Sequence, residues 1–123
     1  SRIEGNLLDN MAWSPTGDIL AIEDASTSQP GVWLYDVTAL DTVPPTRITT
    51  DFVITALAWS PDGSLLALGD DNGVVHIYDS ATGAITQEIQ AHPTPVNALS
   101  FNATGTLLST LGTGSEARIW GVR

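Results

Sequence analysis

Three segments of this chain repeat one pattern, and this repetition constrains the fold more than any other feature. The segments are Met11–Ala21, Leu57–Ala67 and Leu99–Ser109. Their aromatic residues Trp13, Trp59 and Phe101 are 46 and 42 residues apart. A period of this length indicates a repeat architecture, in which each supersecondary unit buries its apolar faces against its neighbours.

Turn signals divide each repeat into short strands. In Ser60–Gly63 the proline presets φ and the glycine accepts a positive φ, so this segment predicts a tight turn. Asp71–Gly73 contains the Asn-Gly pair that favours a type I′ hairpin. Sustained 3.6-residue periodicity is absent, and β-branched residues and turn signals recur about every 8–12 residues. We therefore predict an all-β chain.

The strand faces predict how the sheets pack. Ile54–Ser60 and Val96–Phe101 each place small residues on one side and bulky residues on the other, with no charge on either side. A sheet that is uncharged on both faces must be covered on both faces. Small faces stacked on the bulky faces of the next sheet would fill the space between sheets. The pattern favours a radial stack of small sheets.

These features resemble the WD40-repeat β-propeller family, whose repeats of about 40–45 residues form four strands each. The resemblance extends over essentially the whole chain, and its strongest carriers are Trp59–Gly63, Leu65–Ala67, Asp71–Gly73, Val75–Asp79 and Thr82–Gly83. It implies an all-β fold of β-propeller blades, each of four antiparallel strands, with three blades per chain. The expected blades of this single unit span about 7–41, 46–83 and 84–123.

The chain departs from the family signature at several positions. Tyr35-Asp36, Tyr78-Asp79 and Trp120-Gly121 stand at the Trp-Asp positions, and Ala91-His92 stands at the one Gly-His position. The resemblance also implies a His–Ser/Thr–Asp–Trp hydrogen-bond network inside each blade. The third blade has His92, Thr110 and Trp120 with Thr113 in place of Asp, and the second has Asp71 without the His. These networks are therefore expected to be incomplete.

Charge and composition exclude several classes of function. With 4 Lys+Arg against 14 Asp+Glu the net charge is −10, which disfavours nucleic acids and anionic membranes as partners. The chain has no cysteine, so disulfides, thiolate metal sites and cysteine nucleophiles are excluded. No apolar run approaches the length of a membrane helix, and Ser1–Gly5 has no signal-peptide character. We expect a cytoplasmic protein.

Motifs that could carry chemistry have simpler structural readings. Gly112–Ala117 matches a dinucleotide fingerprint but precedes a strand rather than a helix, so we interpret it as a hairpin loop. Asp70–Gly73 lacks the alternating ligand spacing of a calcium loop. His76, expected to point outward from a strand, and His92, in an inter-blade loop, would need carboxylates to complete a zinc site. We expect no catalytic residue, cofactor or metal.

The resemblance implies a protein-interaction scaffold, and one rim of the propeller is the expected binding face. In this family the loops between second and third strands and the loops between blades share a rim. Here they hold Glu23, Asp24, Asp51, Phe52, Asp70, Asp71, Asn72, His92 and Glu116. The six carboxylates lack a nearby cation in sequence, so we expect a negative rim that attracts a basic protein or peptide, with Phe52 and His92 as anchors. The alternative is that these residues form a solvent-exposed rim with no binding role.

Three blades are too few for a closed ring, because each would have to span about 120° where propellers use 4–8 blades. Open end blades would expose uncharged faces, with Met11 and Trp13 or Leu99 and Phe101 as candidates. The third repeat ends after its third strand, and residues 2–4 could supply the missing strand to a partner. We therefore predict a homodimer that forms a six-bladed propeller. The alternatives are an enzyme, metal or small-ligand site at the centre of the assembled propeller, and an engineered or structural fragment without a specific partner.

Overall fold

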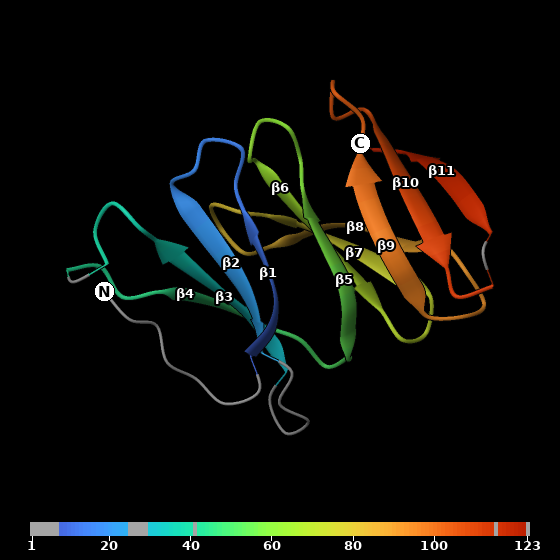
Figure 1. The fold of residues 1–123 in the computed structure, drawn as a ribbon, viewed down its shortest axis with the longest axis horizontal. Helices are drawn as coiled ribbons and strands as arrows, with labels where there is room; N and C mark the ends of the chain where they lie inside the picture. Colours follow the sequence, from blue (N-terminus) through green and yellow to red (C-terminus); the bar gives the residue numbers. More distant parts are fainter. Residues whose placement is uncertain (1–7, 25–29, 41, 115, 123) are drawn as a thin grey trace.

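The computed structural model describes residues 8–24, 30–40, 42–114 and 116–122, and every regular element in them is a β-strand (Figure 1). In chain order the strands are β1 (Leu8–Trp13), β2 (Ile19–Asp24), β3 (Gly31–Asp36), β4 (Thr46–Thr49), β5 (Ile54–Trp59), β6 (Leu65–Asp70), β7 (Val74–Asp79), β8 (Ile85–Gln90), β9 (Val96–Phe101), β10 (Leu107–Gly112) and β11 (Ala117–Gly121). The predicted all-β class is confirmed. No helix in these ranges has the length and apolar character needed to span a membrane.

The strands form three antiparallel sheets that follow one another along the chain. Their strand orders are β1-β2-β3-β4, β5-β6-β7-β8 and β9-β10-β11. The first two sheets end later in the chain than the expected blades. They end at Thr49 and Gln90, whereas the expected blades end at residues 41 and 83. β4 completes the first sheet because Arg47 pairs with Trp33, and β8 completes the second because Ile89 pairs with Val75. As predicted, the third repeat contributes three strands to its sheet among the described residues.

The first hairpin of each sheet is closed by the same turn, as the repeated sequence predicts. A glycine N–H donates to the carbonyl three residues earlier, and the side chain of that earlier residue accepts the N–H that begins the next strand. The closing bonds are Gly17 to Ser14 (2.9 Å), Gly63 to Ser60 (3.0 Å) and Gly105 to Asn102 (3.0 Å). The three glycines have φ of 78°, 76° and 72°, a conformation that costs other residues steric strain.

The hairpin between β6 and β7 has a different turn from the predicted one. A type I′ turn would place Asn72 and Gly73 at its centre, whereas the Gly73 N–H donates to the Asp70 carbonyl at 3.3 Å and so closes the turn around Asp71 and Asn72. Gly73 takes the last position with φ of 83°. The prediction was wrong because the Asp70 carboxylate accepts the N–H groups of Asn72 and Val74, both at 2.9 Å, and thereby organises the turn.

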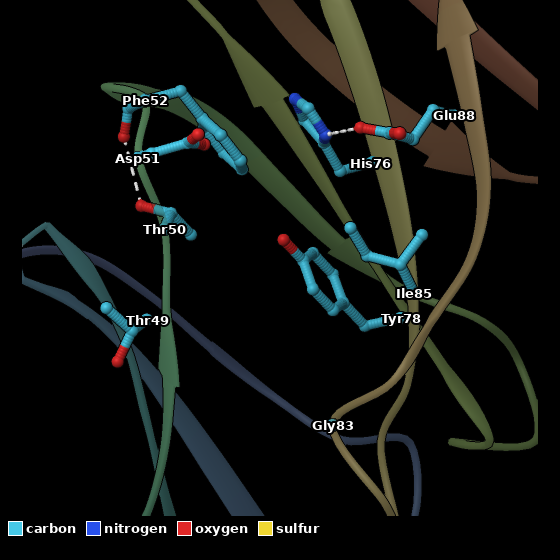
Figure 2. A pocket seen from close by; sticks show the side chains of 9 residues that line it. All are labelled: Thr49, Thr50, Asp51, Phe52, His76, Tyr78, Gly83, Ile85 and Glu88. Carbon is cyan, nitrogen blue, oxygen red and sulfur yellow. Dashed lines mark hydrogen bonds and ion pairs between the residues drawn. The ribbon is translucent and has the colours of Figure 1, made fainter.

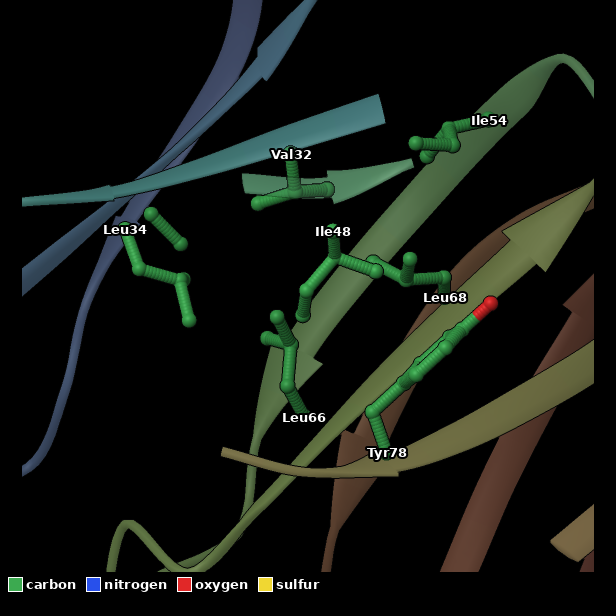
Figure 3. Packing of buried hydrophobic residues seen from close by; sticks show 8 residues of the cluster. Val32, Leu34, Ile48, Ile54, Leu66, Leu68 and Tyr78 are labelled. Carbon is green, nitrogen blue, oxygen red and sulfur yellow. The ribbon is translucent and has the colours of Figure 1, made fainter. Parts of the chain in front are cut away.

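Two apolar clusters hold the sheets together, one at each sheet-to-sheet interface. The first joins Ala21, Val32, Leu34 and Ile48 of the first sheet to Ile54, Leu66, Leu68 and Tyr78 of the second (Figure 3). The second joins Ala56, Ala67, Val75, Ile77 and Ile89 of the second sheet to Val96 and Leu108 of the third. In each interface the face that carries the small strand residues lies against the bulky face of the next sheet, which agrees with the predicted stacking.

The outer faces of the first and third sheets each carry exposed apolar residues. Met11 and Trp13 on β1 are 69% and 57% exposed, as predicted. On the third sheet the exposed residues are Ile119 (71%) and Leu107, whereas the predicted Leu99 and Phe101 pack against the second cluster. That part of the prediction was wrong because all sheets stack in the same direction. Each bulky face covers the preceding sheet, so the free face of the last sheet is its small face.

Candidate functional site

Backbone hydrogen bonds gather the predicted rim loops along one edge of the sheets. The link between β4 and β5 is bonded to the β2–β3 loop and to the β6–β7 turn, through Thr50 to Pro30 (3.0 Å) and Asp71 to Val53 (3.2 Å). The β6–β7 turn is bonded to the β8–β9 link, because the Gly73 carbonyl accepts the N–H groups of residues 91 and 92. Consecutive hairpin loops and inter-sheet links are therefore neighbours.

The nine predicted rim residues differ in exposure. Asp51, Asp71, Asn72 and Glu116 are exposed, and Asp24 and Phe52 are half-buried. Glu23, Asp70 and His92 are buried, with 2–3% of each residue exposed. The three buried residues make contacts inside the protein, so only the other six can contact a partner.

Arginine side chains accompany two of the rim carboxylates, contrary to the expectation from sequence neighbours. Asp24 lies 3.1 Å from Arg47, which also stacks 4.7 Å from the centre of the Trp33 ring. Glu116 lies 2.7 Å from Arg118, and the hydrogen bond and charge of that guanidinium lower the pKa of Glu116. The expectation failed for Asp24 because β3–β4 pairing brings Arg47 across the sheet. At Glu116 the expectation was wrong because Arg118 is only two residues away in the sequence.

His92 is part of an internal network rather than a surface anchor. Its Nε2 lies 2.8 Å from Thr110 Oγ1, which also accepts the Trp120 indole N–H at 3.1 Å. A Cβ on Gly112 would lie 2.9 Å from His92 Nδ1, so the imidazole packs directly on that backbone. The third sheet therefore forms the His–Thr–Trp part of the expected network, whereas Thr113 lies exposed. Because His92 is 2% exposed, its predicted role as a surface anchor is not supported by this placement.

His76 lies inside the second sheet and contacts two carboxylates. Its Nε2 is 2.8 Å from Asp70 Oδ2, and its Nδ1 is 2.7 Å from Glu88 Oε2. Because carboxylates only accept hydrogen bonds, both contacts can form together only on the doubly protonated ring. The residue is 6% exposed, so the expectation of an outward-pointing His76 was wrong. The Asp70 carboxylate turns this ring inward, and the residue also stacks on Phe52.

A pocket of about 510 Å³ opens beside this group (Figure 2). It is lined by Thr49, Thr50, Asp51, Phe52, His76, Tyr78, Gly83, Ile85 and Glu88. The Phe52 and His76 rings stack with their centres 3.8 Å apart and form one wall. Burial, followed by the charges of Glu88 and Asp51, raises the pKa of Tyr78 to about 12. We call this cavity the Tyr78 pocket.

Sequence reasoning placed Asp51 and Phe52 at the rim and considered His76 only as a zinc ligand, so it did not bring His76, Tyr78 and Glu88 together with them. His76 and Glu88 are direct cross-strand partners of the β7–β8 hairpin. The turn at Asp79–Gly83 could have predicted that pairing. The stacking of Phe52 on His76 joins the β4–β5 link to β7, and no local signal indicates it. In the described part of the chain, no group of three or more His, Cys, Asp or Glu side chains could hold a metal ion.

Comparison with known proteins agrees with the geometry. A family model described as the anaphase-promoting complex subunit 4 WD40 domain matches residues 11–104. Autophagy-related protein 18 of Mycosarcoma maydis is 45% identical over 51 residues, which cover 41% of this chain and 11% of that protein. A chain in a crystal structure of the mitotic checkpoint complex matches with a TM-score of 0.75 and 24% identity, over 95% of this chain and 34% of that chain.

The matched parts of this chain thus cover about a tenth of the first of these proteins and about a third of the second. The structural match shows the fold, and the family model covers most of the sequence. The resemblance predicted from the repeats is confirmed. With its three stacked antiparallel sheets and their repeated turns, the chain belongs to the WD40-repeat β-propeller family.

Proposed function

We propose that this protein is an interaction scaffold that binds a basic protein or peptide at its acidic rim. WD40 propellers generally act as non-enzymatic platforms for other proteins, and the similar solved structure is that of a complex, the mitotic checkpoint complex. The observation that carries the proposal is the line of hydrogen-bonded loops that presents Asp51, Asp71 and Glu116 on one edge. A surface with this excess of carboxylates attracts cationic partners and speeds their association.

We propose further that two copies assemble into a six-bladed propeller. By the repeat alignment, Met11 and Trp13 on the open face of the first sheet correspond to Leu57 and Trp59 of the second sheet, which pack against the first cluster. Leu107, Ser109 and Ile119 on the open face of the third sheet correspond in the same way to Leu65, Ala67 and Ile77, which pack in the second cluster.

The open faces therefore have the same kinds of residues as the two faces that already pack inside the chain. A third sheet placed on the first sheet of a second copy would repeat the internal interface, and two such contacts close a ring of six sheets. The strand that would complete the third sheet is proposed to come from residues 2–4 of the partner copy, which lie outside the described residues.

Light scattering or native mass spectrometry at micromolar concentration tests the assembly. We expect a mass of twice 12.9 kDa. Ile119→Glu should dissociate it, because this 71% exposed residue lies on the open face of the third sheet. Val43→Glu is the control, since Val43 is 47% exposed in the β3–β4 link and lies on neither open face. Deleting residues 1–5 should weaken the dimer. A well-folded species with the mass of one chain would refute the two-copy ring.

Titration with a basic peptide at increasing salt tests the rim. We expect binding that weakens with ionic strength and with Asp71→Asn, because Asp71 is exposed. This variant is preferable to one at Asp70, whose carboxylate organises the β6–β7 turn. Binding that is insensitive to both changes would refute an electrostatic rim.

A further inference from the structure

Tyr78 is a largely buried residue whose hydroxyl makes no hydrogen bond to the described residues. The residue is 5% exposed, and because none of the described side chains has a fully buried oxygen or nitrogen without a partner, this hydroxyl is the part of Tyr78 that reaches the open pocket. Figure 2 shows this hydroxyl directed into the space between the Phe52–His76 wall and Thr50. The cavity therefore presents an unused polar group to whatever enters it.

The charge around this hydroxyl selects a cation. Asp51 is exposed at the edge of the pocket, and Glu88 extends over the opposite side with its side chain 54% exposed. Both carboxylates act on the Tyr78 phenol, whose pKa burial and their charges raise to about 12. Even with a doubly protonated His76, the carboxylates Asp51, Asp70 and Glu88 outnumber the cation three to one. An anion such as phosphate would be repelled.

The walls of the pocket select the shape of the cation. The stacked rings of Phe52 and His76 form a flat side, and Ile85, which is 49% exposed, forms an apolar side. Gly83 adds no side chain between them. A ligand that fits has an apolar stem and a cationic head, as long basic side chains do. The volume of about 510 Å³ lies within the range of small-ligand sites.

From these observations we propose that the Tyr78 pocket binds the side chain of an arginine in a partner protein or peptide. The guanidinium would lie between Asp51 and Glu88 and donate one N–H to the Tyr78 hydroxyl, while the stem packs along Phe52 and Ile85. Arginine fits better than lysine because its planar group can bond two carboxylates and an oxygen at once and can lie flat against aromatic rings. This inference rests on the proposed scaffold function and adds the residue that the partner supplies.

Peptide titrations followed by amide NMR shifts test the proposal. The probe is acetyl-Gly-Arg-Gly-amide, and the matched control peptide carries citrulline, which has the same shape without the charge. We expect saturable shifts at residues 50–52 and 83–88 with arginine, and at least tenfold weaker binding with citrulline. Asp51→Asn and Glu88→Gln should each weaken arginine binding about tenfold. Tyr78→Phe should weaken it several-fold.

Asp18→Asn is the control variant, because Asp18 is an exposed carboxylate between β1 and β2 that belongs neither to the predicted rim nor to the lining of the Tyr78 pocket. It should leave binding of this short peptide unchanged, and thermal melts confirm that each variant is folded. Equal binding of arginine and citrulline would overturn the proposal. A loss of binding in Asp71→Asn with none in Asp51→Asn would also overturn it, while leaving the acidic rim intact. Absence of binding by any basic peptide would reject the pocket and the rim together.

Discussion

The hydroxyl of Thr110 should stabilise the third sheet more than any other single polar atom there. Thr110 is 2% exposed, and its oxygen contacts His92 Nε2 at 2.8 Å and the Trp120 indole nitrogen at 3.1 Å. Thr110→Val replaces this hydroxyl by a methyl group of similar size, so the change removes two hydrogen bonds and creates little cavity. A buried polar group left without a partner costs about 1–3 kcal/mol.

The two partners of Thr110 differ in how well they can find a replacement. His92 is 2% exposed and its ring packs against Gly112, so it keeps most of the penalty. Trp120 is half-buried, and water can partly satisfy its N–H. We therefore expect Thr110→Val to lower the free energy of unfolding by about 2–4 kcal/mol. This is a large share of the roughly 5–15 kcal/mol that stabilises a typical domain.

Urea denaturation at one fixed protein concentration measures this loss, because the stability of an assembling chain depends on concentration. Thr49→Val is the matched control: this strand residue is exposed, so the change should stay within about 0.5 kcal/mol. In the double variant with Trp120→Phe, the loss of unfolding free energy should be smaller than the sum of the two single-variant losses, because both changes remove the same hydrogen bond. A loss in Thr110→Val no larger than that in Thr49→Val would refute the reasoning.

Three further predictions concern turns and titration. Gly73→Ala should destabilise the fold far more than Gly17→Ala in thermal melts, because both glycines have positive φ but only at Gly73 would a Cβ overlap a backbone carbonyl of the β8–β9 link. The hydrogen bonds from Ser64 lower the pKa of Asp62 from 3.8 to about 2. The contribution of the Asp62 carboxylate to stability should be present above pH 4 and disappear as the pH falls toward 2. In Asp62→Asn the unfolding free energy measured with urea should therefore depend less on pH between 4 and 2. Tyr78 is the opposite case: its folded-state pKa of about 12 lies above the ordinary value of 10, so stability should fall between pH 10 and 12, and less steeply in Tyr78→Phe.

Much of the fold could be predicted from sequence because its determinants are local. The turn at Ser60–Gly63 needs a proline that presets φ and a glycine that accepts a positive φ, and both requirements are met within four residues. Alternation along Ile54–Trp59 is also local, and it already separates the face that packs on the preceding sheet from the face that packs on the next. The β6–β7 turn shows the limit of such reasoning, since the side chain of Asp70 outweighed the preference of the Asn-Gly pair.

The candidate site depended on contacts between segments that are far apart in the chain. The charged rim followed from loop positions, but the register of β3 and β4 brought Arg47 to Asp24, and the packing of the β4–β5 link brought Phe52 onto His76. No property of Phe52 or His76 alone indicates that they form one wall of a pocket with Tyr78 and Glu88.

The repeat sequence by itself determined the class of fold, the first turn of each sheet and the two-faced character of the strands, because each depends on residues a few positions apart. Only the tertiary structure decided which faces stay open and which polar side chains are buried. The sheets stack in a single direction, so Leu99 and Phe101 are covered while Leu107 and Ile119 are exposed. Burial of His76 and His92 likewise arises where separate strands and links meet, and such meeting points follow from strand register and sheet packing rather than from local sequence.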